Sequence, residues 1–352
     1  MTQTKVMVAM SGGVDSSVAA WLLKQDGYDC MGATMKLFSP EQIRSCAPIE
    51  DSRDAQKIAE LLQIPFAVYD CSEEFRHRVI DYFIQTYLDG GTPNPCVICN
   101  RTMKFGHLLA LARASGCARI ATGHYARIER GENGRYLLRT AVDASKDQSY
   151  VLWQLTQEQL AHTLFPLGGM QKSEIREVAL ANGFVNAERR DSQDICFIPD
   201  GDYVDFIERN TDVQSSKGDF IDRDGNVLGQ HAGHLRYTIG QRKGLGIAFG
   251  KPTYVCAKNA ETNTVTLGSN EELFARELTA HSINLISCER LNAPTRVLAK
   301  VRYKATPATA TVEQIDSDRI SVIFDEPQRA ISPGQSVVLY VGEYVLGGGI
   351  IS

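Results

Sequence analysis

The sequence predicts an α/β N-terminal domain with a doubly wound, mostly parallel sheet, followed by two small β domains, the last of them a β-barrel. From residue 5 to about 127, apolar strand-like runs alternate with amphipathic helical patterns, which is typical of a parallel sheet. After about residue 210 the helical periodicity fades, and short β-rich runs separated by Gly, Asn and Asp take over. We therefore expect domains at 1–209, 210–280 and 281–352.

The predicted N-terminal elements place polar and glycine residues at strand ends, where a doubly wound sheet binds its ligands. The glycine-serine loop after the first strand, Met35 after the second and Gly123-His124 after a later one all fall at such ends. The expected strands are 6–9, 28–37, 66–69 and 120–122, and the expected helices are 18–23, 51–62, 73–88, 103–114 and 173–182. In the last domain the expected strands are 296–303, 310–313, 320–324 and 336–340.

The loop from Ser11 to Ser17, with the sequence SGGVDSS, lies between an apolar strand and a helix start. Turn amides and the N-terminus of a helix together favour an anion, and the serines add hydroxyl donors. The sequence lacks GxxxxGK[ST] and GxGxxG here, which excludes a P-loop NTPase and a dinucleotide fingerprint. The loop predicts a phosphate site, and the alternative is an ordinary turn with Asp15 as a helix-start residue.

Three of the nine cysteines stand in positions that suggest chemistry. Cys96 and Cys99 form a CxxC after a loop with two prolines, near the start of a helix, where a thiolate is stabilised. Cys196 lies far downstream before an apolar Phe-Ile pair, a context that is also typical of a core residue. Zinc, redox and iron–sulfur interpretations of the CxxC are all open at this point.

The net charge of −5 gives no overall nucleic-acid signature, so any RNA footprint must be local. No Asp or Glu occurs from 225 to 260, where Arg242-Lys243 form a basic loop. Alternation in the strand 296–303 predicts Arg296, Lys300, Arg302 and Lys304 on one face, although a solvated strand face would look the same. No signal peptide and no apolar run of membrane-spanning length is present, so we expect a cytoplasmic protein with no membrane partner.

The loop SGGVDSS resembles the pyrophosphate loop of the ATP pyrophosphatase superfamily, whose fold is adenine nucleotide alpha hydrolase-like. Together with TPNPCVICN, ATGHYAR, KDQSYVLW, DSQDICFI, TIGQRKGLGI, VRY and AISPGQ, in this order, it is similar to the tRNA-specific 2-thiouridylase family over essentially the whole chain. Members of this family adenylate the C2 oxygen of a wobble uridine with ATP and replace that oxygen with sulfur.

The resemblance implies which residues contact each substrate. ATP and Mg²⁺ would be cofactors, with Asp15 on the metal and Gly123 allowing a close approach of adenosine. The implied nucleotide-binding residues are Ala9, Met10, Ser11, Gly12, Gly13, Val14, Asp15, Ser16, Met35 and Gly123. The implied contacts to tRNA, at its anticodon region, are Asn94, Pro95, Cys96, His124, Lys146, Asp147, Gln148, Arg302, Tyr303 and Gln335.

By the same resemblance Cys196 would carry a persulfide and Cys99 would be the partner nucleophile, since thiol–disulfide exchange can release the sulfur. Many relatives carry Asp at the position of Cys96, which leaves two alternatives: Cys96, Cys99 and Cys196 as ligands of a [4Fe–4S] cluster, or a structural zinc. The sulfur donor, a cysteine desulfurase or a sulfur-relay protein, is not fixed by the sequence. Neither another adenylating ATP pyrophosphatase nor an RNA-binding sulfur carrier with a vestigial loop is excluded by the loop alone.

Overall fold

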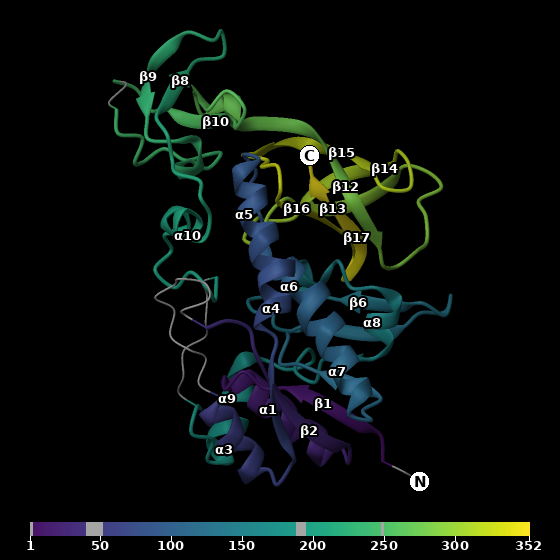
Figure 1. The fold of residues 1–352 in the computed structure, drawn as a ribbon. Helices are drawn as coiled ribbons and strands as arrows, with labels where there is room; N and C mark the ends of the chain where they lie inside the picture. The colour runs from purple at the N-terminus through teal and green to yellow at the C-terminus, as the bar shows by residue number, and fades with distance from the viewer. Residues whose placement is uncertain (1–2, 40–51, 188–194, 248–249) are drawn as a thin grey trace.

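The computed structural model describes residues 3–39, 52–187, 195–247 and 250–352 (Figure 1). The N-terminal part is a parallel sheet of order β3-β2-β1-β4-β7, which confirms the predicted fold class. Its strands are β1 (Lys5–Ala9), β2 (Asp29–Lys36), β3 (Phe66–Asp70), β4 (Arg119–Ala121) and β7 (Thr163–Leu164). The first strand is central because its side chains are apolar on both faces, as a buried parallel strand requires.

The helices of the N-terminal part are α1 (Val14–Gln25), α3 (Arg53–Leu61), α4 (Ser72–Phe75), α5 (Asp81–Leu88), α6 (Pro95–Cys99), α7 (Leu108–Ala114), α8 (Gln157–Ala161) and α9 (Lys172–Ala181). Helices α1, α3 and α9 pack on one face of the sheet and α7 on the other, whereas α4 and α5 pack in a separate apolar cluster. The predicted helix 73–88 is α4 and α5 joined by a π-helical turn at Arg76–Ile80. The predicted helix 103–114 begins earlier, because Pro95 occupies the first helical turn, where a missing N–H costs nothing, and a π-helical segment Asn100–His107 continues it into α7.

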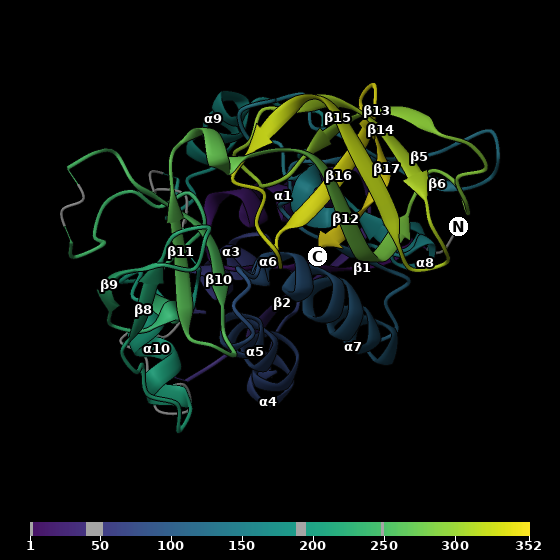
Figure 2. The same ribbon diagram turned by 90° about the horizontal axis from the view of Figure 1, so that it is seen from above.

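The central β domain is a four-stranded sheet of order β10-β11-β8-β9 that follows helix α10 (Tyr203–Asn210). Its strands are β8 (Gly218–Ile221), β9 (Val227–His231), β10 (Tyr254–Asn259) and β11 (Thr264–Gly268). A small apolar core including Phe220, Val255 and Val265 fills it. Seen from above, this domain and the barrel lie on different sides of α5 (Figure 2).

The C-terminal strands form an antiparallel barrel that closes where β12 pairs with β17. They are β12 (Phe274–Leu285), β13 (Thr295–Lys300), β14 (Ala308–Gln314), β15 (Ile320–Arg329), β16 (Ser336–Val341) and β17 (Tyr344–Ile351). The predicted C-terminal strands correspond to β13–β16, and β12 runs through the predicted boundary at residue 280. The predicted domain limits stay a prediction.

One expectation about the barrel is wrong. The strand predicted to reach residue 303 ends at Lys300, and residues 301–305 form a turn. Arg302 and Lys304 therefore do not extend a four-cation strand face. Arg296, which is on the strand, makes a bidentate ion pair with Asp325 of β15 at 2.8 and 2.6 Å, so its charge is already neutralised.

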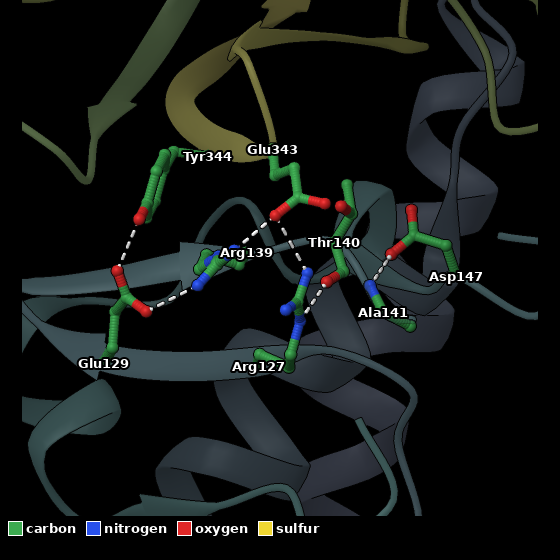
Figure 3. Close-up of polar contacts among 8 residues, drawn as sticks. All are labelled: Arg127, Glu129, Arg139, Thr140, Ala141, Asp147, Glu343 and Tyr344. Carbon is green, nitrogen blue, oxygen red and sulfur yellow. Dashed lines mark hydrogen bonds and ion pairs between the residues drawn. The ribbon is translucent and has the colours of Figure 1, made fainter. Parts of the chain in front are cut away.

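A hairpin of the N-terminal part, β5 (Arg127–Arg130) and β6 (Tyr136–Arg139), extends the barrel sheet through a pairing of Arg139 with Tyr344. A polar network reinforces this junction (Figure 3). Glu129 accepts from Arg139 at 2.8 Å and from the Tyr344 hydroxyl at 2.6 Å, and Glu343 accepts from both Arg139 and Arg127. The barrel is thus fixed to the N-terminal part by paired charges as well as by β pairing. Within the described part of the chain, no helix has the length and apolar character that crossing a membrane requires.

Candidate ATP and tRNA thiolation site

The loop between β1 and α1 has the geometry of an anion-binding turn. Gly12 has a φ of +74°, which a side chain would disfavour, and Gly13 is the N-cap of α1 and so has no side chain to cap the helix. The Ser16 hydroxyl accepts from the Ser11 backbone N–H at 3.2 Å and donates to the Gly13 carbonyl at 3.0 Å. The Ser17 hydroxyl also donates to that carbonyl, at 3.0 Å. These bonds hold the turn rigid while the first-turn amides of α1 face outward.

Asn186, which sequence reasoning missed, supports this loop from behind. Its side-chain amide donates to the Gly12 carbonyl and to the Ser17 hydroxyl, both at 2.9 Å. Met10 is buried in the core, so it reaches a ligand only through its backbone. Met35 is half-buried at the end of β2, between two apolar clusters.

Asp15 is the centre of a half-buried polar group. Its Oδ1 accepts from the Tyr125 hydroxyl and from the Lys172 ammonium, both at 2.6 Å. Lys172 begins α9 and is 8% exposed, and its ammonium also lies 5.6 Å from the centroid of the Tyr125 ring. Sequence reasoning missed both partners. Tyr125 follows Gly123-His124 directly, but no sequence signal placed Lys172 beside the loop.

The packing of the protein itself requires a glycine at position 123. A Cβ at this position would lie 2.8 Å from the backbone carbonyl carbon of Asp15 and 2.8 Å from the Ser16 nitrogen, closer than such atoms approach. The end of β4 and the start of α1 therefore touch backbone to backbone, and glycine is the residue that permits it.

His124, the next residue, is 8% exposed and packs between aromatic rings. Its ring centroid lies 5.6 Å from that of Phe105 and 6.0 Å from that of Phe165, and its Nδ1 hydrogen-bonds the Thr122 hydroxyl at 2.7 Å. Burial, and then the positive charge of Lys104, lower the His124 pKa well below its usual value, so the imidazole is neutral. Gly123 and His124 thus connect the Ser11–Ser17 loop to the helix that follows the CxxC.

The cysteines lie around that same helix. Cys96 is exposed in the first turn of α6, whereas Cys99 is buried in an apolar cluster with Phe197 and Ile198. Because Phe197 follows Cys196 directly, this cluster brings the segment of Cys196, itself exposed, next to α6. Desolvation by the surrounding protein raises the pKa of the Cys96 thiol, and the positive charge of Lys104 partly opposes this rise. The first part of the DSQDICFI motif, residues 191–194, lies outside the described residues.

Several expected tRNA contacts are hydrogen-bonded within the protein. The Gln335 side-chain amide donates to the carbonyls of Thr92 (2.9 Å) and Pro93 (3.3 Å), fixing the loop before α6 to the barrel. In that loop Pro95 is buried and Asn94 is half-buried. Asn94 and Pro95 therefore stand between the barrel and Cys96.

Lys146-Asp147-Gln148 also link two parts of the molecule. Gln148 accepts from the Tyr125 N–H (3.0 Å) and donates its own N–H to the Tyr125 carbonyl (2.9 Å). On the other side, the Tyr303 hydroxyl donates to the Asp147 carbonyl at 3.2 Å. This segment therefore links Tyr125, which binds Asp15, to Tyr303 in the turn after β13.

Two cations lie at the end of β13 and in the turn that follows it. Arg302 is exposed, and the Lys300 ammonium lies 5.7 Å from the Tyr150 ring centroid and 5.8 Å from that of Tyr303. Burial raises the Tyr303 pKa, with smaller contributions from neighbouring charges that include Cys96, so the phenol and the thiol lie within electrostatic range. In the central domain, Arg242 and Lys243 are exposed, whereas Arg236 pairs with Glu208 at 3.4 Å and the Lys258 ammonium is buried.

Comparison with known proteins decides the family. Residues 4–200 match the family described as the tRNA methyl transferase HUP domain, 204–269 the tRNA methyl transferase PRC-barrel domain, and 275–351 the aminomethyltransferase beta-barrel domain. The tRNA-specific 2-thiouridylase MnmA of Clostridioides difficile is 51% identical over 352 residues, 99% of this chain and 98% of that protein. The chain belongs to the tRNA-specific 2-thiouridylase family.

The tRNA-specific 2-thiouridylase MnmA of Acetivibrio thermocellus is 48% identical, and the match covers 100% of this chain and 100% of that protein. Among solved structures, the U34-tRNA thiolase NcsA from Methanococcus maripaludis with its [4Fe-4S] cluster matches 59% of this chain and 66% of its own at 17% identity. The TM-score of this match is 0.36. The 2-thiouridylase family uses ATP.

A cluster or a zinc ion held by the three cysteines does not fit the arrangement of this 2-thiouridylase family member. Cys99 is buried in an apolar cluster, whereas Cys96 and Cys196 are exposed. Within residues 3–39, 52–187, 195–247 and 250–352, no group of three or more His, Cys, Asp and Glu side chains is placed to hold a metal.

Proposed function

We propose that this chain adenylates the C2 oxygen of the wobble uridine of tRNA with ATP and then replaces that oxygen with sulfur from a persulfide on Cys196. The observation that carries the proposal is the bridge formed by Gly123 and His124. Gly123 touches the backbone of Asp15 in the phosphate loop, and His124 packs on Phe105 in the helix that follows Cys96 and Cys99. A base bound beside this bridge meets the ATP α-phosphate and the cysteines at once.

The first step activates a carbonyl that is otherwise unreactive. The uridine O2 attacks the α-phosphorus, the bond from that phosphorus to the bridging oxygen breaks, and pyrophosphate leaves with the electron pair. The loop amides and the α1 dipole stabilise the phosphates electrostatically. In this proposal residues 9–16 bind the phosphates, Met35 and Gly123 lie against the adenosine, and Asp15 holds the Mg²⁺ that neutralises their charge.

The second step is thiol chemistry. The terminal sulfur of the Cys196 persulfide adds to C2 and AMP leaves. The Cys99 thiolate then attacks the Sγ of Cys196, so the S–S bond breaks, its electron pair stays on the sulfur now attached to C2, and a Cys99–Cys196 disulfide forms. A dithiol reductant must reduce that disulfide before the next turnover. The persulfide itself comes from a cysteine desulfurase or a sulfur-relay protein.

The proposed tRNA surface runs from the loop before α6 to the barrel turn. It comprises Asn94, Pro95, Cys96, His124, Lys146, Asp147, Gln148, Arg302, Tyr303 and Gln335. A flipped base needs stacking and hydrogen bonds around it, which the aromatic and amide groups here supply. The basic loop at Arg242-Lys243 adds phosphate contacts from the central domain.

Mass analysis of tRNA after incubation with ATP, Mg²⁺ and a sulfur source tests this function. The wild type should add sulfur to the wobble uridine, C99S and C196S should not, and C196S should still release pyrophosphate that depends on tRNA. Pyrophosphate release without tRNA would favour another adenylating enzyme, and no pyrophosphate release at all would favour a sulfur carrier.

Iron and sulfide analysis after anaerobic purification tests the cluster alternative. About four irons per chain would overturn the persulfide relay.

A further inference from the structure

A buried lysine lies at the phosphate loop, although the loop sequence contains none. The Lys172 ammonium is 2.6 Å from Asp15 Oδ1, a residue 157 positions earlier in the chain. The backbone that carries this lysine is fixed, because the Lys172 N–H donates to the Asp143 carboxylate at 3.0 Å. The Asp143 carboxylate is itself held by the Ser145 N–H (3.0 Å) and hydroxyl (2.6 Å).

Placing the Lys172 ammonium away from water costs free energy, which suggests that its charge has a role beyond pairing with Asp15. The Lys172 side chain is 10% exposed and that of Asp15 is 29% exposed, so mainly the lysine loses its hydration, and the attraction between the two charges barely offsets that loss. Asp15 could be held by the Tyr125 hydroxyl alone, at 2.6 Å, without a buried lysine. The position of the ammonium, against the first turn of α1 and at the start of α9, is one where two helix N-termini already favour an anion.

We propose that Lys172 is a phosphate-binding residue of this site, and that its pair with Asp15 is the form it takes without nucleotide. When Asp15 turns to a magnesium ion, the ammonium is released to donate to the β- and γ-phosphate oxygens. It thereby supplies the positive charge that a P-loop enzyme takes from a lysine within its loop. The same charge stabilises the pyrophosphate as it leaves. This inference rests on the proposal that residues 9–16 bind the phosphates of ATP.

The test compares ATP with AMP, because only ATP carries the phosphates that Lys172 would contact. Affinities for both are measured calorimetrically with Mg²⁺ and without tRNA, for the wild type, K172Q and K172R. We expect K172Q to bind ATP about 10- to 100-fold more weakly, as loss of a charged hydrogen bond predicts, and AMP within about twofold of the wild type. K172R, which keeps the charge, should recover most of the ATP affinity. Equal weakening of both nucleotides, or no weakening of either, would overturn the inference.

Two further variants separate the possible failures. K57Q removes the same charge from the surface of α3, where Lys57 makes only a 3.9 Å pair with Asp54, and should bind both nucleotides normally. S16A removes the hydroxyl that holds the Ser11 N–H, and should weaken ATP binding. If S16A and K172Q both bind ATP as the wild type does, the loop is not the nucleotide site; if only K172Q does, the lysine inference alone fails.

K172Q leaves the half-buried Asp15 carboxylate without this cation, so its folding is checked by thermal unfolding. If K172Q does not fold, D15N and D15N/K172Q carry the test, because neither contains the Asp15 charge. In Mg²⁺-free buffer, D15N should keep a preference for ATP over AMP and the double variant should lose it. Equal preference in the two variants would count against a role for Lys172 at the phosphates.

Discussion

The side-chain amide of Gln335, in the C-terminal barrel, donates to the carbonyl of Thr92, in the loop that leads to Cys96, at 2.9 Å. The backbone N–H of Thr92 in turn donates to the Pro333 carbonyl at 2.8 Å. The barrel therefore sets the position of the CxxC loop directly, and it does so from residues more than two hundred positions away.

Replacing Gln335 with Ala should loosen that loop. We expect a roughly 5- to 30-fold loss of kcat for tRNA thiolation, since a small displacement of reacting groups has a large effect on rate, with only a small fall in Tm. Pyrophosphate release measured in the absence of a sulfur donor reports adenylation alone, which separates that step from sulfur transfer. Q328A, in which the lost bond is a local one to Glu326, is the control and should retain normal activity. A normal kcat for Q335A would show that the loop keeps its position without this bond.

A Cβ at Gly123 should damage the ATP site. In G123A the added carbon would meet the backbone of Asp15 and Ser16 at 2.8 Å, so α1 or β4 must shift. We expect at least a tenfold loss of ATP affinity and a destabilisation of about 1–3 kcal/mol, typical of overpacking. Calorimetric titration and thermal unfolding measure the two effects. G169A, where a Cβ would meet nothing within 4 Å, is the matched control, and equal behaviour of the two variants would contradict the steric argument.

The alternation of strands and helices predicted the parallel sheet correctly, because a buried parallel strand and an amphipathic helix each leave a pattern within a few residues. The barrel strands were predicted for the same reason. Contacts between distant segments leave no such pattern. The pair of Arg296 with Asp325, the pair of Lys172 with Asp15, and the attachment of the β5–β6 hairpin to the barrel all depend on which strand or helix lies alongside, which spacing does not encode.

The expected RNA contacts show the same limit. The motif containing Asp147 and Gln148 is long and specific, yet in the structure both residues hold other parts of the protein: Gln148 binds Tyr125, and Asp147 accepts from Ala141 and Ser149. A family motif can therefore consist of residues that hold the parts of a site in place, and not only of residues that contact the substrate. Which of these residues also touch tRNA stays a prediction.

Lys258 should make stability depend on pH. Its ammonium is buried, 6.0 Å from the Tyr87 ring centroid, and burial lowers its pKa from about 10.5 to about 8. Between these values the unfolded chain binds a proton that the folded chain does not, so stability rises with pH across this window, and the penalty is complete below pH 8. K258M should therefore be more stable than the wild type at pH 7, by about 3 kcal/mol at most.

The stability gain of K258M should shrink as the pH rises from 8 toward 10. Urea unfolding of both proteins at matched pH values measures the difference, in which the titration of other groups cancels. A gain that is the same at pH 7 and pH 9.5 would mean that added apolar packing, and not the buried charge, accounts for it.

Arg302 should contribute to tRNA binding through its charge. It is exposed in the turn after β13, beside the Tyr303 that binds Asp147, and so is free to reach a phosphate. R302A should weaken tRNA binding about 3- to 10-fold near physiological salt and reduce the dependence of log K on log salt concentration by about one counterion. Filter binding at several salt concentrations gives both quantities. R296A removes the same charge from an arginine that Asp325 already neutralises, so its affinity and salt slope should stay close to those of the wild type. If the two variants lose affinity equally, the effect is a general one of net charge and Arg302 makes no specific contact.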